Sequence, residues 1–407
     1  MKDMEKSVVM VSAVRTPFDK FGGAMRAINS IDLSIKVLQE VVDRVGVPKE
    51  TVEEIILGEC MHAEMAMYQN VPARQALLKA GFPPETISAT VDRACCSSMY
   101  SIELAYSAIA NGDRDCMIAA GADNMSNIPY LVPPAMRWGM RIGAVEMDDQ
   151  LFPLGYSRTG WTPVALDAGK VALEYGVSRE EQDRWALRSQ LFYAKAQEKG
   201  VFKEEIVPIT IPDKKKGDII IDSDTNARPD TTYEALAKLK TVYDSPTITA
   251  GNAPGMNTGA SAILLMSEEK AKEMGLEPIA YLRATASVAD KAEYIPRVPA
   301  TAIQKALKKT NLTLDDLKLI EINEAFAAMP LVSTKILGGD DTEKVEKIRN
   351  ITNVNGGAIA IGHPVGATAA RLVMTLAFEL RRRGGGYGAA SICGGLAQGD
   401  CVILEVK

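Results

Sequence analysis

Short apolar runs alternate with helical patterns along this chain, and that alternation leaves few folds open. In the first part, strand-like runs cover residues 8–14, 89–93 and 116–121, and helical patterns cover residues 32–45 and 97–110. Strands that are buried on both faces by helices have this sequence pattern. We therefore predict an α/β fold with a largely buried sheet.

The C-terminal third repeats the scheme. Strand-like runs cover residues 279–284, 319–322, 389–393 and 402–406, and helical patterns cover residues 300–308, 324–337 and 367–383. Each part also has a reactive residue just before a helix that is followed by a short apolar strand, Cys95 in the first and His363 in the second. The repeat predicts two similar α/β halves, with both residues at corresponding loop ends, where α/β sheets place their sites.

An irregular stretch separates the two halves. Residues 122–243 contain several prolines, a polar hairpin-like segment at residues 213–217 and, at Ser178, a capping box that opens a long helix. We interpret this stretch as an inserted lid. The predicted domains are an N-terminal half (residues 1–121 plus 244–272), the lid (residues 122–243) and a C-terminal half (residues 273–407).

Composition excludes several classes of function. No apolar run approaches the ~20 residues of a transmembrane helix, and the N-terminus lacks the successive regions of a secretory signal. The net charge of -6 provides no basic field for nucleic acid. The six cysteines lack the paired spacing of a zinc site. We therefore expect a cytoplasmic protein that holds no metal ion and binds neither nucleic acid nor a membrane.

The chain has two histidines, so an imidazole base must be His62 or His363. His363 lies in the glycine-rich residues 355–367, and glycines allow a ligand or a backbone segment to approach closely. His62 has no comparable setting. A purely structural role for His363 remains an alternative on this evidence.

Cys95 and Cys96 stand between a strand-like run and a helical run. A helix N-terminus lowers the pKa of a cysteine and favours the thiolate, so one of these thiols is a candidate nucleophile. The alternative is a buried thiol pair in a tight turn.

Two further candidates lie at strand ends. Cys393 closes an apolar run and precedes Gly394 and Gly395, whose backbone N–H groups could bind an oxyanion; an interior strand cysteine is the alternative. Asn323 follows the run at residues 319–322, and a helix cap would explain it without any function.

Four stretches occur in the order and at the approximate positions typical of one family. They are CCSSM from Cys95, NEAFAA from Asn323, GGAIAIGHP from Gly356 and CGGLAQG from Cys393. With these motifs the chain resembles the thiolases over essentially its whole length.

The resemblance implies a duplicated thiolase-like fold. Two α/β halves would pack as a five-layer αβαβα arrangement with a lid over coenzyme A, and the chains would assemble as a homodimer or homotetramer. The implied enzyme is an acyltransferase of fatty acid metabolism that cleaves 3-ketoacyl-CoA, or condenses acetyl-CoA with an acyl-CoA, by ping-pong transfer. CoA and acyl-CoA would be its substrates, with no permanently bound cofactor.

The resemblance also assigns roles to residues. Cys95 would be the nucleophile, His363 the base that activates it, and Cys393 the acid/base toward the acetyl-CoA carbanion. Asn323 would hold a water that faces the thioester enolate together with His363. The N–H groups of Cys95 and Gly395 would face the tetrahedral adduct.

Coenzyme A contacts are implied at Arg228, Ala250, Ala325 and Phe326. Arg228 falls where the family places an arginine against the nucleotide, and a guanidinium can stack on adenine or pair with phosphate. A solvated loop charge is the alternative for Arg228. The other three residues would line the pantetheine tunnel.

The chain departs from the family pattern at several positions. Cys96 stands where glycine is usual, so the choice of Cys95 over Cys96 rests on the family's register. Leu396 and Ala397 interrupt the glycine-rich run after Cys393, and Pro254 replaces a serine near pantetheine. Residues 294–296 replace a Met-Gly-type segment near the acyl pocket, and the lid lacks a histidine that many members have. These changes leave the acyl chain undetermined.

Two other interpretations stay open. A β-ketoacyl synthase shares the duplicated fold but generally needs two active-site histidines, and His62 is poorly placed for that. A non-catalytic subunit that binds acyl-CoA or scaffolds a partner is also compatible with the fold. The presence of Cys95, Asn323, His363 and Cys393 favours the enzyme.

Overall fold

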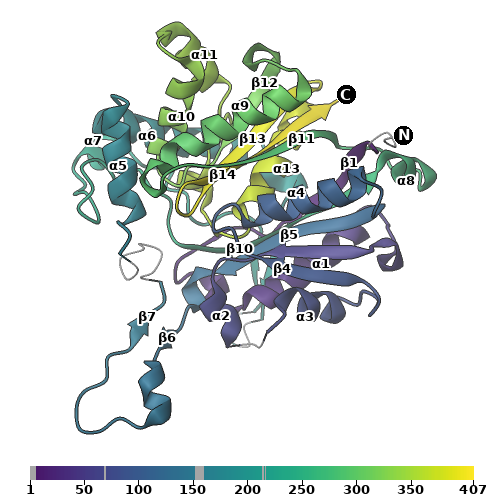
Figure 1. Cartoon of the computed structure of the whole chain (residues 1–407), viewed down its shortest axis with the longest axis horizontal. Helices are drawn as coiled ribbons and strands as arrows, with labels where there is room; N and C mark the ends of the chain where they lie inside the picture. Colours follow the sequence, from purple (N-terminus) through teal and green to yellow (C-terminus); the bar gives the residue numbers. More distant parts are fainter. Residues whose placement is uncertain (1–5, 68–69, 152–159, 213–214, 216) are drawn as a thin grey trace.

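The structure is a computed structural model, and it describes residues 6–67, 70–151, 160–212, 215 and 217–407. Two α/β halves lie against each other, the first in purple and blue and the second in green and yellow (Figure 1). The turn of the hairpin-like segment predicted at residues 213–217 falls partly outside the described residues. The strands that flank it, β8 (Ile209–Ile211) and β9 (Ile219–Ile221), pair antiparallel.

The two halves have the same strand order. In the first, the order is β1 (Val8–Arg15), β10 (Asn257–Ser267), β5 (Cys116–Asn124), β3 (Glu54–Gly58) and β4 (Ile87–Val91). In the second, it is β11 (Ala280–Ala289), β14 (Gln398–Val406), β13 (Gly386–Gly394) and β12 (Leu317–Ile322). An isolated parallel bridge from Ile320 to Thr352 stands where β4 stands in the first half. The predicted duplication is therefore confirmed in the strand order.

Strand β1 joins the two sheets. It pairs antiparallel with β10 along its length and with β11 through Val8, Val9 and Met10. The short strand β2 (Asp19–Lys20) pairs with the start of β10.

Helices and sheets form five layers. The middle layer contains α4 (Ser97–Ala110) and α13 (Thr368–Arg382), which contact strands of both halves and share one apolar core with them. On the outer face of the first sheet lie α1 (Ser30–Asp43) and α3 (Pro72–Lys79), and on that of the second lies α9 (Val298–Thr310). This confirms the predicted αβαβα arrangement. Because α4 and α13 sit between the sheets, the loops before them open onto the same place.

The remaining helices flank this body. They are α2 (His62–Ala66), α5 (Val164–Glu174), α6 (Arg179–Glu198), α7 (Tyr233–Ala237), α8 (Glu268–Glu273), α10 (Ala328–Gly338), α11 (Thr342–Asn350) and α12 (Ala358–Ile361). The predicted capping box opens α6, since the Ser178 side chain accepts from the Glu181 N–H and the Glu181 side chain accepts from the Ser178 N–H.

A long hairpin projects from the body around β6 (Tyr130–Leu131) and β7 (Asp148–Asp149), as Figure 1 shows at the lower left. Its exposed apolar side chains include Tyr130, Trp138 and Ile142. In the part of the chain that the structure describes, the helices are all too short or too polar to cross a membrane.

Candidate active site

Cys95 sits in a sharp turn between β4 and α4. Ala94 has a left-handed backbone, with φ 48°, and the turn is closed by hydrogen bonds from Cys96 N–H to Arg93 O and from Ser97 N–H to Ala94 O, both at 3.0 Å. Helix α4 begins two residues after Cys95, which is partly buried. The turn thus places Cys95 between the end of a strand and the start of a helix, as predicted from the sequence.

His363 lies between α12 and α13, and its backbone is held from the first half of the chain. Its N–H donates to Asn257 Oδ1 at 2.8 Å. The preceding Gly362 has φ 109°, and a Cβ there would lie 2.8 Å from Asn257 Cγ. Glycine is therefore required at this position, which explains part of the glycine-rich context seen in the sequence.

Hydrogen bonds fix which imidazole nitrogen carries the proton. His363 Nδ1 lies 2.7 Å from Thr368 Oγ1, and the Thr368 hydroxyl donates to Pro364 O at 2.7 Å. Since that hydroxyl proton is already used, Thr368 Oγ1 accepts from Nδ1–H. The unprotonated Nε2 then faces Cys95 Sγ at 3.3 Å. This is the arrangement of a general base and a thiol.

Burial sets the charge of this pair. It raises the pKa of the Cys95 thiol to about 12 and lowers the pKa of His363 to about 3, with the Arg371 cation adding to the second effect. Both groups are therefore neutral near pH 7. The expectation that the helix N-terminus would leave a thiolate at Cys95 is wrong for the substrate-free protein, because desolvation outweighs it.

Asn323 follows β12 and contacts the same imidazole. Its Nδ2 lies 3.4 Å from His363 Nε2, and among the described residues its buried Oδ1 has no hydrogen-bond partner. Helix α10 begins only at Ala328, so the helix-cap explanation for Asn323 is wrong. A buried amide with one free acceptor beside the base suits a bound water.

The neighbouring Glu324 is a buried acceptor that the sequence did not single out. Its carboxylate accepts from Trp185 Nε1 at 2.9 Å, Ser189 Oγ at 2.7 Å, Asn353 Nδ2 at 2.9 Å and Ile359 N–H at 3.2 Å. These bonds tie helix α6 and the start of α12 to the segment that carries Asn323. In this pair Asn323 contacts the imidazole, and Glu324 anchors the segment that carries Asn323.

Cys393 and Gly395 stand at the β13–β14 turn, close to the Cys95 turn. Cys393 is fully buried; burial raises the pKa of its thiol, and a negative charge at Cys95 raises it further. A Cβ on Gly394 would lie 2.9 Å from both Arg93 O and Cys96 Sγ, so the two turns meet only because residue 394 is glycine. Gly395 lines a cavity of about 420 Å³ together with Ala94.

Cys96 points elsewhere. Its Sγ donates to Ile392 O at 3.6 Å, and the side chain is completely buried in the core between the sheets. The geometry therefore favours Cys95 over Cys96 as the thiol that meets the base. His62 does not reach this pair; its Nε2 lies 2.8 Å from Asp92 Oδ2 and its side chain is 60% exposed.

The predicted CoA contacts lie on three segments of the chain. Ala325 and Phe326 are partly buried and pack against the core under α5 and α10, and Ala250 is exposed on a nearby loop. A hydrogen bond from Ala327 N–H to Asn252 O, at 2.9 Å, joins that loop to the Ala325 segment. Arg228 is exposed, and its backbone N–H donates to Gln190 Oε1 at 2.8 Å.

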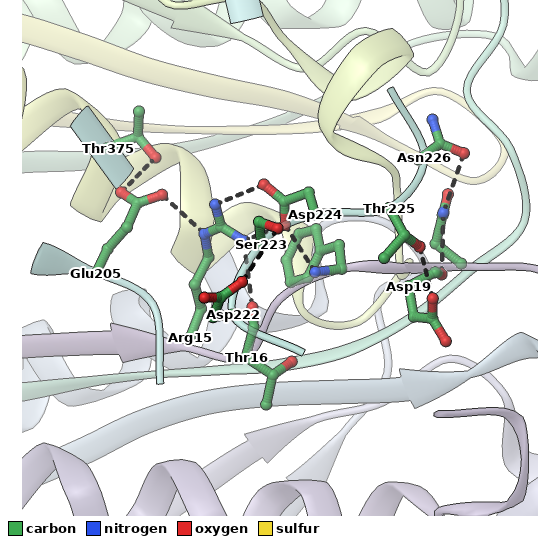
Figure 2. Close-up of polar contacts among 12 residues, drawn as sticks. Arg15, Thr16, Asp19, Glu205, Asp222, Ser223, Asp224, Thr225, Asn226 and Thr375 are labelled. Atoms are coloured by element: carbon green, nitrogen blue, oxygen red, sulfur yellow. Dashed lines mark hydrogen bonds and ion pairs between the residues drawn. The ribbon is translucent and has the colours of Figure 1, made fainter. Parts of the chain in front are cut away.

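Figure 2 shows a buried polar network around Arg15 and Asp224. Arg15 donates to Glu205 Oε1 at 2.7 Å and to Asp224 Oδ1 at 2.6 Å, and all three side chains are buried. Two residues beyond Asp224, the side chain of Asn226 accepts from Asn257 Nδ2 at 3.2 Å, and Asn257 in turn holds the His363 N–H. The sequence patterns described above do not predict this network.

Comparisons with known proteins identify the family of this chain. Residues 8–269 match the family described as thiolase, N-terminal domain, and residues 276–406 match thiolase, C-terminal domain. The chain belongs to the thiolase family. This thiolase is accordingly an acyltransferase, as its sequence predicts, and neither the synthase nor the non-catalytic interpretation is supported.

Named relatives of this thiolase cover it from end to end. It is 40% identical over 406 residues to an acetyl-CoA acetyltransferase of Syntrophomonas wolfei, covering 99% of this chain and 100% of that one. It is 41% identical over 409 residues to a beta-ketoadipyl-CoA thiolase of Pseudomonas aeruginosa, with the same coverage. The crystal structure of human mitochondrial 3-ketoacyl-CoA thiolase in complex with CoA superposes with a TM-score of 0.91 at 35% identity, covering 99% of each chain.

Proposed function

We propose that this thiolase transfers an acyl group between the thiol of Cys95 and CoA, and that 3-ketoacyl-CoA is its substrate in the cleavage direction. The observation that carries the proposal is the contact between Cys95 Sγ and the unprotonated His363 Nε2 at 3.3 Å. The family membership and the named relatives support the same chemistry.

In cleavage, His363 Nε2 takes the Cys95 proton as the sulfur attacks the ketone carbonyl carbon. The bond between C2 and C3 of the substrate then breaks, and the acetyl-CoA carbanion takes the proton of the Cys393 thiol. Acyl-Cys95 remains. An incoming CoA thiol gives its proton to the Cys393 thiolate and attacks the acyl carbonyl, and Cys95 leaves and regains its proton from His363.

Two developing negative charges need donors. The backbone N–H groups of Cys95 and Gly395 face the tetrahedral adduct in this proposal, while His363 and a water held by Asn323 face the enolate. The buried Oδ1 of Asn323, which has no hydrogen-bond partner in the described part of the chain, supports the second part. One such donor typically lowers a barrier by about 3 kcal/mol.

Coenzyme A enters, we propose, between the inserted residues 122–243 and the two halves bounded at residues 1–121 plus 244–272 and 273–407. Arg228 would face the nucleotide, and Ala250, Ala325 and Phe326 would line the pantetheine path. The hydrogen bond that joins the Ala250 loop to the Ala325 segment supports this route. CoA acts as a substrate here, and no permanently bound cofactor is required.

A homodimer or homotetramer fits two exposed surfaces. Among the described residues, strand β4 pairs on one side only, with β3, and an edge strand of this kind is a template for pairing with a second copy. The projecting hairpin exposes Trp138 and Ile142, which a second contact would bury. We also propose a cytoplasmic location and a role in fatty acid metabolism; the six free thiols suit a reducing compartment.

Thiolysis of acetoacetyl-CoA by purified protein tests this function. We expect activity in the wild type and in Cys96→Ser, and a loss of at least about 1000-fold in Cys95→Ser, since an alcohol cannot replace the thiol under this base. Full activity in Cys95→Ser, or none in the wild type, would contradict the proposal.

A further inference from the structure

Two non-glycine residues with left-handed backbones form the turn after Gly395, the proposed oxyanion donor. Leu396 has φ 57° and Ala397 has φ 56°, in the left-handed region that disfavours residues with a Cβ. They lie between Gly395 and Gln398 in the tight β13–β14 connection. Such strain persists where the side chain has a use or the surroundings force it.

The two side chains have different surroundings. Ala397 is fully buried against the core under α5 and α10. Leu396 is 37% exposed, and it lines two cavities at once. One is the cavity of about 420 Å³ that Gly395 and Ala94 also line. The other, of about 40 Å³, is lined by Trp161, Val164, Ala292 and Ile295 and by the polar Thr162, Asp167 and Glu293.

On the proposed mechanism, an acyl group on Cys95 extends into the larger cavity. His363 Nε2 lies 3.3 Å from the sulfur, and Asn323 contacts the same imidazole. On the proposed mechanism the acyl carbonyl oxygen points at the N–H groups of Cys95 and Gly395. The carbons beyond the carbonyl then enter the larger cavity, whose wall includes Cys60, Met61 and Ile128, and Cys60 and Ile128 pack on the same small apolar cluster as Cys95.

We infer that Leu396 is a specificity-determining residue that separates these two cavities and restricts the thiolase to short acyl chains. This inference rests on the proposed function, because it places the acyl carbonyl at Gly395. With the leucine side chain removed, the larger cavity opens into the space beside Trp161 and Ile295, and a longer chain gains apolar burial against these two side chains.

Two neighbouring substitutions separate side-chain size from backbone strain. Leu396→Ala removes the side chain and keeps a residue with a Cβ in the left-handed region. Ala397→Gly relieves the same backbone strain one residue later and leaves both cavities unchanged. Leu396→Gly does both, and it provides a second test if Leu396→Ala does not fold.

The measurement is the ratio of kcat/KM for 3-ketooctanoyl-CoA to that for acetoacetyl-CoA. We expect Leu396→Ala and Leu396→Gly to raise this ratio by about tenfold or more, Leu396→Phe to lower it, and Ala397→Gly to keep it within about twofold of the wild type.

An unchanged ratio in Leu396→Ala would overturn the inference, as would an equal rise in Ala397→Gly, which would assign the effect to backbone freedom. In either case a wild type that cleaves acetoacetyl-CoA and depends on Cys95 leaves the proposed function intact. A wild type that cleaves no 3-ketoacyl-CoA would overturn both.

Discussion

At the scale of single residues, the site holds a neutral thiol against a neutral imidazole. The pKa of Cys95 is raised to about 12 and that of His363 is lowered to about 3, so no thiolate and imidazolium pair exists before substrate binds. The proton moves only as the sulfur attacks. This arrangement keeps the thiol unreactive toward incidental electrophiles while the base stays available over a wide pH range.

Alkylation of Cys95 by iodoacetamide should therefore rise with pH without a plateau. Because the thiolate is the reacting form and the pKa is far above 9, the rate should increase about tenfold per unit between pH 6 and 9. Peptide mapping identifies the modified residue. A rate that is constant across this range would show a preformed thiolate and contradict the neutral pair.

Thr368 holds the imidazole in the required tautomer, because its Oγ1 accepts from Nδ1–H at 2.7 Å. We expect Thr368→Val to lower kcat for thiolysis by roughly 10- to 100-fold, because the base loses its orientation. KM should change little, because Thr368 takes no part in substrate binding. Thr368→Ser keeps the hydroxyl and should retain most of the activity. A wild-type kcat in Thr368→Val would show that Thr368 does not orient the base.

At the scale of elements, local signals were sufficient for the frame of the site. The helix over residues 97–110, the capping box of α6 and the strand before Cys393 were all predictable, because each depends on neighbours within a few residues. The supports of the site were not. Thr368, Asn257 and Glu324 act through contacts that the fold alone creates, and burial of the Cys95 turn reversed the pKa shift expected from a helix end.

Glu324 shows how one side chain joins several elements. Its carboxylate is completely buried and accepts from donors on α6, α12 and the Asn353 segment. We expect Glu324→Ala to lower the free energy of unfolding by at least about 3 kcal/mol, because several buried donors lose their acceptor. Urea unfolding measures this. Glu324→Gln keeps one acceptor oxygen and should lose less free energy of unfolding. Equal losses in the two variants would show that Glu324 stabilises the fold through packing and not through its hydrogen bonds.

At the scale of the whole molecule, buried acidic groups connect the halves. Asp123 accepts from the backbone N–H groups of Cys60, Met61 and Gly366, which belong to loops of both halves. Burial raises its pKa to about 7, and burial also raises the pKa of Glu321, beside Arg371, to about 8. When folding raises the pKa of a carboxyl group, the free energy of unfolding falls as the pH rises from the unfolded pKa to the folded pKa.

The sign of the resulting pH dependence follows. Below pH 6.5 the lowered pKa of His363 makes the free energy of unfolding rise with pH, because the unfolded histidine binds a proton that the folded one does not. This rise opposes the fall that the two acids cause. Above pH 6.5 the effect of His363 ends. The folded protein still holds protons on Asp123 and Glu321 that the unfolded chain has released, so its stability falls as the pH rises. We expect the free energy of unfolding to fall by about 2 kcal/mol between pH 6.5 and 8.

Urea titrations at several pH values measure this fall. Glu321→Gln cannot ionise, so its stability should vary less over the same range than that of the wild type. A free energy of unfolding that rises from pH 6.5 to 8 would contradict the direction assigned to both carboxyl groups.

The identity of the acylated sulfur tests the account most directly. We would incubate the wild type, Cys95→Ser and Cys96→Ser with acetyl-CoA, quench in acid and locate the acetyl group by fragmentation of the peptide that contains both cysteines. We predict acetyl-Cys95 in the wild type and in Cys96→Ser, and no thioester in Cys95→Ser. An acetyl group on Cys96, or one that persists in Cys95→Ser, would contradict it.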